Sequence, residues 1–126
     1  MQKSPEIKRF VQKTLGCSCP EDVFRKIDCT IASDGLWDRK INVGDRLLIY
    51  IIDLNRHQEI PEVIESAMQR GVGERNNQGF NRFRLVLVTS KRDELSVSAE
   101  RAFTSSEFAD EMTHLHIVNH EDIKGL

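Results

Sequence analysis

The feature that most constrains the fold is the run from Leu47 to Ile52, six consecutive apolar residues rich in isoleucine. A strand that is apolar on both faces is typical of the centre of a sheet that is covered on both sides. The run is far shorter than the roughly 20 residues that a membrane-spanning helix requires. Residues 83–89 are expected to form another buried strand and residues 115–118 the last strand, with helical patterns between the strands. The order β-α-β-α-β predicts parallel strands joined by right-handed crossovers.

The first of the intervening helices is expected to begin at Pro61 and to end at Gly71. Its apolar stripe consists of Ile60, Val63, Ile64, Ala67 and Met68. Residues 72–82 are rich in glycine, asparagine and charge, and we expect them to form a long loop. Between 96 and 112 the capping residues predict two short helices or one kinked helix.

The N-terminal segment, residues 1–27, is expected to be helical in two pieces. The first helix covers 5–15, and Pro20 opens a short second helix. Residues 29–32 predict a strand that pairs with the central run through a loop over 35–44. Together these patterns predict a single α/β domain spanning all 126 residues, with a mixed, mostly parallel sheet of about four strands.

Composition narrows the classes of function. The formal net charge is −2 and acids and bases are interspersed, which gives no electrostatic reason to expect a nucleic-acid partner. The polar start of the chain and the lack of a long apolar segment predict a cytoplasmic protein with no membrane partner. Three cysteines, an odd count, weigh against a secreted disulfide framework and favour reduced thiols.

Two of the cysteines, Cys17 and Cys19, are separated by one residue between the two N-terminal helix signals. Because both sulfurs leave one turn, they predict either a redox-sensitive pair that closes a short disulfide or a chelate for zinc or iron. Cys29 is the candidate third ligand, and a histidine, a water or a second subunit would be the fourth. A helix N-terminus at Cys19 favours its thiolate, although Glu21 and Asp22 in the first turn oppose that effect.

The alternative for the cysteines is structural. Cysteine is among the most buried residue types, so Cys17 and Cys29 also fit as small core residues, with Cys19 merely capping a helix. Cys29 alternates with Ile31, which favours the core for that residue.

Histidines recur at even spacing near the end of the chain. In an extended strand, the rings of His114, His116 and His120 point to one face, with His114 and His116 about 6.6 Å apart. Such a row fits a zinc site. The preferred interpretation is the solvent-facing side of an edge strand, with Leu115 and Ile117 packing inward and His120 just past the strand end.

In open parallel sheets ligands bind beyond the carboxyl ends of the strands, which here are residues 53–58, 90–93 and 119–122. The basic side chains of these loops predict a site for a small anion, a phosphate or a carboxylate. They are Arg56, His57, Lys91, Arg92 and His120. The alternative is that these charged loop residues are simply exposed to solvent, as charged residues usually are.

Trp37, the only tryptophan, stands in a loop where it either anchors a protein partner or folds down over the sheet. Aromatic residues mix with arginines between 75 and 84, as in binders of single-stranded nucleic acid. The acidic balance of the chain and an expected core position for Phe83 weigh against that interpretation. The glycines between 71 and 79 precede a strand rather than follow one, which excludes a phosphate-binding loop.

The chain resembles small uncharacterised prokaryotic α/β proteins in two segments, LGCSCPEDVF over 15–24 and GFNRF over 79–83. No activity comes with the resemblance, which implies only that the cysteine turn and the glycine-containing segment matter together. The C-x-x-C between a strand and a helix that thioredoxin-like proteins carry is absent.

The sequence thus favours a thiol site, redox-sensitive or metal-binding, at Cys17 and Cys19. The alternative is a non-catalytic interaction module that binds a protein or a small anionic ligand and has structural cysteines. No Ser-His-Asp order, G-x-S-x-G or H-E-x-x-H pattern is present, so an enzyme is not favoured.

Overall fold

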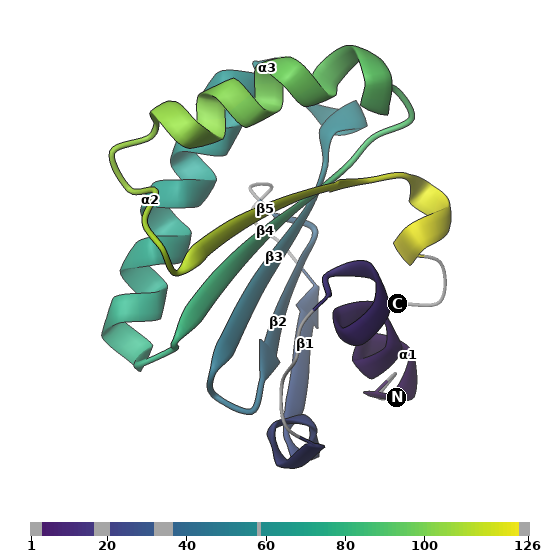
Figure 1. The fold of residues 1–126 in the computed structure, drawn as a ribbon, viewed down its shortest axis with the longest axis vertical. Helices are drawn as coiled ribbons and strands as arrows, with labels where there is room; N and C mark the ends of the chain where they lie inside the picture. Colours follow the sequence, from purple (N-terminus) through teal and green to yellow (C-terminus); the bar gives the residue numbers. More distant parts are fainter. Residues whose placement is uncertain (1–3, 17–20, 32–36, 58, 124–126) are drawn as a thin grey trace.

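The structure, a computed structural model, describes residues 4–16, 21–31, 37–57 and 59–123, which form a five-stranded sheet with helices on both faces (Figure 1). The strands lie in chain order, so β3 is central and β1 and β5 are the edges. Their bounds are β1 Ile27–Ile31, β2 Arg39–Val43, β3 Leu47–Asp53, β4 Arg82–Val88 and β5 Thr113–Val118. The first two pairings are antiparallel and the last two are parallel. The predicted α/β class and mixed sheet are confirmed, but the sheet has five strands and is half antiparallel rather than mostly parallel.

The strand that the sequence did not predict is β2, which lies in the stretch expected to be a connecting loop. Ile41 and Val43 are buried on β2, whereas its other side chains are partly exposed. β2 separates β1 from β3, so the first expected strand does not pair with the central run. β1 is consequently an edge, where Cys29 is exposed and Ile31 is 76% exposed. The expected core position of Cys29 is therefore wrong.

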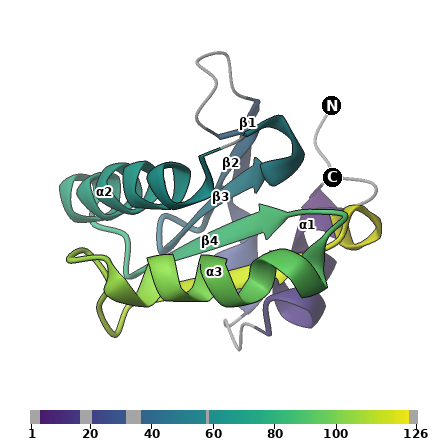
Figure 2. The ribbon, with the colours of Figure 1, turned by 90° about the horizontal axis from the view of Figure 1, so that it is seen from above.

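Two long helices cover one face of the sheet and the N-terminal helical segment covers the other (Figure 1). The helical elements are α1 Ser4–Arg9, the π-helical turn η1 Phe10–Thr14, η2 Glu21–Arg25, η3 Leu54–Arg56, α2 Ile60–Gln78, α3 Arg92–Ser105 and η4 His120–Ile123. On the side of α2 and α3, the core includes Tyr50, Phe83 and Leu85. On the other side, buried residues of η1 belong to one core with Ile49 and Val86. Seen from above, α3 runs along β5 at the outer edge of the sheet (Figure 2).

The N-terminal helix is confirmed as α1 followed by η1, and Gly16 ends it with a φ of 68°. The second short helix is confirmed as η2, while its expected cap and first residue, Cys19 and Pro20, lie outside the described residues. Among the described helices, none is long and apolar enough to cross a membrane.

α2 continues to Gln78, so the expected helix end at Gly71 and the expected loop over 72–82 are wrong. Gly71 lies where an added Cβ would overlap the ring of Phe83, so this glycine lets the helix approach the sheet closely. The glycine that does end the helix is Gly79, whose φ of 78° is left-handed. The region expected to hold two short or one kinked helix contains the single helix α3, followed by turns over 106–112.

Candidate functional site

Four nitrogen-bearing side chains gather on one face of β4 and β5. Arg82 and Arg84 alternate along β4 with side chains of the α2 and α3 face, and they share the opposite face with the buried Val86. On β5, His114 and His116 lie on that same face, because the parallel register sets Arg84 opposite His114 and Val86 opposite His116. We call Arg82, Arg84, His114 and His116 the Arg–His patch.

Each arginine of the Arg–His patch donates to a histidine of the neighbouring strand. Arg82 Nη1 lies 3.2 Å from His114 Nε2, and Arg84 Nη1 lies 2.8 Å from His116 Nε2. Since a guanidinium can only donate, each Nε2 accepts and each neutral imidazole carries its proton on Nδ1. Arg84 Nη1 also donates to the carbonyl oxygen of Leu15 at 3.3 Å. Beyond these bonds the patch therefore offers only N–H donors: the Nδ1–H groups of the two imidazoles and the other N–H groups of the two guanidiniums.

The surroundings keep both imidazoles neutral. Burial lowers the pKa of His116 to about 4, and the positive charge of Arg84 acts in the same direction. The pKa of His114 is also lowered, first by burial and then by Arg84 and Arg82, although Asp110 opposes the shift. Burial lowers the pKa of Arg84 as well, yet a guanidinium stays protonated in proteins. At neutral pH the patch thus carries two fixed positive charges and two neutral rings.

Within the described part of the chain, no carboxylate forms an ion pair with Arg82 or Arg84. Nε of Arg84 is buried and has no hydrogen-bond partner. A partly buried cation that has only neutral acceptors is under-compensated, since burial of charge is unfavourable unless the group is paired with an opposite charge. The patch is therefore suited chemically to an anionic group.

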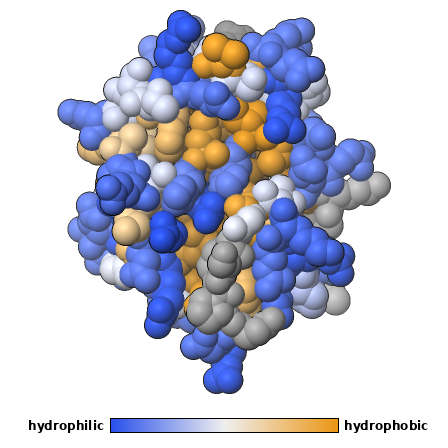
Figure 3. Space-filling view, viewed as in Figure 1, coloured by the Kyte–Doolittle hydropathy of each residue, from blue (hydrophilic) through white to orange (hydrophobic). Residues whose placement is uncertain are grey.

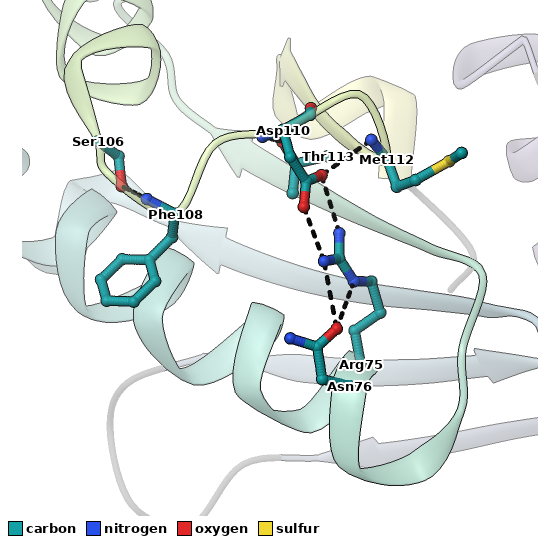
Figure 4. A network of polar contacts seen from close by, with 7 residues as sticks. All are labelled: Arg75, Asn76, Ser106, Phe108, Asp110, Met112 and Thr113. Carbon is teal, nitrogen blue, oxygen red and sulfur yellow. Dashed lines mark hydrogen bonds and ion pairs between the residues drawn. The ribbon is translucent and has the colours of Figure 1, made fainter.

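The acidic residue whose charge reaches His114 is already engaged elsewhere. Arg75 Nη1 and Nη2 donate to the two carboxylate oxygens of Asp110 at 2.9 and 2.7 Å (Figure 4). These bonds lower the pKa of the Asp110 carboxyl. Asp110 Oδ1 also accepts the N–H of Met112, and Thr113 Oγ1 accepts the N–H of Asp110. The network fixes the turn that leads from α3 into β5 and thereby positions the two histidines.

A groove of about 850 Å³ runs along the outer edge of β5, next to the Arg–His patch. All of β5 lines it, Phe103 and other residues of α3 form one wall, and Thr14 and Asp122 lie on the other side. Figure 3 shows apolar surface between α3 and the N-terminal helical segment, bordered by hydrophilic residues. The groove and the patch share His114 and His116.

The candidate thiol site cannot be assembled from the described residues, because Cys17 and Cys19 lie outside them. Cys29 is on β1, in the cross-strand row that ends at Arg84 and His114. Three strand spacings separate Cys29 from Arg84, about 14 Å. Within the described ranges, no group of three or more histidine, cysteine or acidic residues is placed to hold a metal ion.

The histidines follow the expected alternation. Leu115 and Ile117 pack towards α2 and α3, which confirms their inward orientation on an edge strand. His120 lies just past the strand, as expected, and its Nε2 is 3.1 Å from Asp53 Oδ2. His120 is therefore not in one row with His114 and His116.

The structure does not join the described basic side chains at the carboxyl ends of the strands by hydrogen bonds. Among His57, Lys91, Arg92 and His120, no hydrogen bond joins any two of the described side chains, and the Arg56 side chain lies outside the described atoms. Nε2 of His57 is buried without a partner. Lys91 caps α3 and Arg92 begins it, where Arg92 lines the groove along β5. An anion site formed by this set stays a prediction.

Trp37 is 7% exposed and covers the sheet, with its ring centroid 5.9 Å from that of Tyr50. Lys40 Nζ lies over the indole, 5.5 Å from its centroid. An exposed anchor for a partner does not fit this position.

Arg82 and Arg84 are the residues that the sequence interpretation did not assign to a site. The signal that could have found them is their two-residue spacing ahead of Val86 and Val88, which places all four on one strand face. No family model, curated protein or solved structure matches the chain.

Proposed function

We propose that the protein is a binding module that takes an anionic group, a carboxylate or a phosphate, at the Arg–His patch. The observation that supports this most strongly is the state of Arg84. Its Nε is buried without an acceptor, and its Nη1 reaches only a neutral imidazole and a backbone carbonyl. An anion that accepts from the guanidinium would compensate its charge.

The rest of the patch fits the same ligand. Arg82 adds a second fixed charge, and the Nδ1–H groups of His114 and His116 add neutral donors. The planar guanidinium fork matches both carboxylate and phosphate oxygens. Because neither charge depends on a histidine proton, the charge of the patch itself is expected to change little between pH 7 and pH 9.

Calorimetric titration with citrate and with inorganic phosphate at low ionic strength and pH 7 tests the proposal. The wild type should bind at least one of the two anions, and Arg84→Gln should weaken binding by about ten- to a hundredfold, as expected for loss of charged hydrogen bonds. Arg101→Gln is the matched control, because Arg101 is an exposed residue of α3 outside the patch and its loss changes the net charge equally. Equal affinity of Arg84→Gln and the wild type, or equal weakening in both variants, would overturn the proposal.

A second function is favoured by one contact. Arg84 Nη1 bonds to the carbonyl of Leu15, which stands two residues before Cys17 in the sequence. A neighbouring positive charge favours a thiolate over a thiol. We therefore also propose that Cys17 and Cys19 form a redox-sensitive or metal-binding site, with zinc or iron as the metal.

The rate of thiol alkylation as a function of pH tests this second proposal, in the wild type and in Arg84→Gln. The site thiol should react with a midpoint below about 8.5, the ordinary thiol value, and the midpoint should rise in the variant. Cys17→Ser and Cys19→Ser identify which thiol responds. Native mass spectrometry of protein purified without chelator should show a bound metal or the loss of two hydrogens. The second proposal would be contradicted by a mass that shows neither a bound metal nor the loss of two hydrogens, together with alkylation midpoints at the ordinary thiol value.

A further inference from the structure

The outer edge of β5 carries backbone groups with no partner strand. Met112 and Val118 direct their carbonyl oxygens to β4, where they accept from Phe83 and Thr89. The N–H and C=O of one residue point to the same side of a strand, and the side alternates from residue to residue. The even-numbered residues of β5 therefore face β4, and Leu115 and Ile117 direct their N–H and C=O groups into the groove.

These outward groups have no hydrogen bond to any residue that the structure describes, since β5 pairs with β4 alone. At the start of the strand the N–H of Thr113 is already bonded to the carbonyl of Asp110. The unpaired ladder thus begins beyond that N–H and ends at Ile117, because the N–H and C=O of Asn119 are both bonded to Asp122. An unpaired edge of this kind is a template for another extended chain.

We propose that the edge of β5 accepts an extended peptide segment of a partner protein as a sixth strand, and that acidic side chains of the segment contact the Arg–His patch. The inference rests on the proposed anion-binding function and names its ligand. Backbone hydrogen bonds supply affinity in such strand addition, and alternate side chains supply specificity.

The two faces of an added strand would meet different chemistry. Its side chains on one face would lie beside His114 and His116 of β5, and Arg84 lies on the next strand, β4. The N–H donors and the positive charge of these residues favour carboxylates on that face. Asp122 lies at the other end of the groove. Carboxylates are therefore favoured next to the histidines and disfavoured near Val118, where β5 ends.

On the opposite face the added strand would lie beneath α3. Leu115 and Ile117 pack on this side, and Phe103 lines the wall of the groove. Asp93 and Glu100 of α3 also line the groove, and they would repel an acidic side chain there. The segment that fits is one that alternates acidic and apolar residues.

A second copy of the chain fits this edge less well. Pairing of β5 with β5 about a two-fold axis would set His114 opposite His116, or His116 opposite its own copy. Either register brings two Arg–His patches together and adds positive charge to positive charge. The other sheet edge, β1, presents Ile27, Cys29 and Ile31 on the corresponding face rather than acidic residues.

The test uses capped seven-residue peptides that alternate valine and glutamate, measured by fluorescence anisotropy against the full chain. Two further peptides carry N-methyl groups, on every valine or on every glutamate, because only one of these sets faces β5. We expect one methylated peptide to lose binding at least tenfold and the other to retain it. A peptide with lysine in place of glutamate should not bind.

Variants of the protein give the complementary test. Ile117→Pro removes one outward N–H at an edge position, where proline is tolerated, and Ile117→Val keeps that N–H. Peptide binding should fall at least tenfold in the proline variant only, while citrate or phosphate binding stays unchanged in both. If Ile117→Pro does not fold, the methylated peptides alone decide.

The two proposals fail in different ways. Equal binding of both methylated peptides and the parent would overturn strand addition and leave anion binding standing. Peptide binding that Arg84→Gln leaves unchanged would overturn the anion site. A dimer in sedimentation experiments that Ile117→Pro dissociates would show that a second copy occupies the edge, which also overturns the proposal.

Discussion

Arg84 on β4 and His116 on β5 share a hydrogen bond of 2.8 Å between Nη1 and Nε2, and the fixed charge of the first adds to burial in keeping the second neutral. The bond requires an unprotonated Nε2. Protonation of His116 would therefore break the bond and set a cation against a cation in a partly buried place. The pair is stable only as a charged arginine and a neutral histidine.

A titration of the histidine rings by NMR should show this directly. We expect a pKa of about 4 for His116 and a pKa below 6.5 for His114 in the folded protein. In Arg84→Gln the pKa of His116 should rise without reaching 6.5, because burial is the larger cause of the shift. A wild-type His116 that titrates near 6.5 would contradict the geometry of the patch.

The free energy of unfolding should depend on pH through the same residue. His116 has a pKa of about 4 when folded and 6.5 as its ordinary value, so between these values the unfolded chain binds more protons. Stability should therefore be complete above pH 6.5 and fall as the pH decreases towards 4, by roughly 1–2 kcal/mol after allowance for solvent screening. Urea unfolding of the wild type and of His116→Gln at several pH values measures the effect. The variant should show a shallower slope over this range, and an equal slope would count against the assignment.

Two glycines of α2 should respond in opposite ways to alanine. Gly71→Ala places a Cβ against the ring of Phe83, and such overpacking is expected to destabilise the protein by about 1–3 kcal/mol. Gly73 has open space at its Cβ position, so Gly73→Ala should stabilise by roughly 0.5–1 kcal/mol through helix propensity. Thermal and urea unfolding of both variants provide the comparison. A loop over these residues would give similar, small effects at both positions.

The ion pair of Arg75 and Asp110 should contribute stability above the ordinary carboxyl pKa. Asp110→Asn is expected to lower the free energy of unfolding at pH 7 by about 1–2 kcal/mol, since it weakens charged hydrogen bonds to an arginine that is 8% exposed. Because the pKa of Asp110 is lowered from 3.8, this stabilisation is lost as the pH falls through the folded-state value. Glu111→Gln is the matched control at an exposed neighbouring position and should have little effect.

The sequence predicted best those strands whose composition requires burial on both faces. An unbroken apolar run such as that of β3 must be buried on both faces, and both faces are covered. β2 escaped prediction because only Ile41 and Val43 are buried in it, too short an alternation to stand out. At Gly71 the local sequence is ambiguous, since a glycine can end a helix or allow close packing, and only the position of Phe83 decides.

The candidate site shows the same division between local and long-range information. A period of two sufficed to place His114 and His116 on one face of a strand. Their bonds to Arg82 and Arg84 join residues that are 32 positions apart, and the register of β4 against β5 brings them together. No local pattern contains that register, so the sequence interpretation assigned the two arginines to no site.

The strand order also makes the Arg–His patch depend on the last parallel pairing of the sheet, that of β5 with β4. β1, β2 and β3 form a meander of near neighbours, whereas β4 and β5 each join the sheet only after a helical crossover. β5 is the last of the described strands in chain order, and it brings His114 and His116 to Arg82 and Arg84. A partly folded chain in which β5 is not paired would keep most of the hydrophobic core. It would lack both the Arg–His patch and the strand edge of β5. Binding competence would therefore report on completion of the fold, which bulk measurements of helix and strand content would miss.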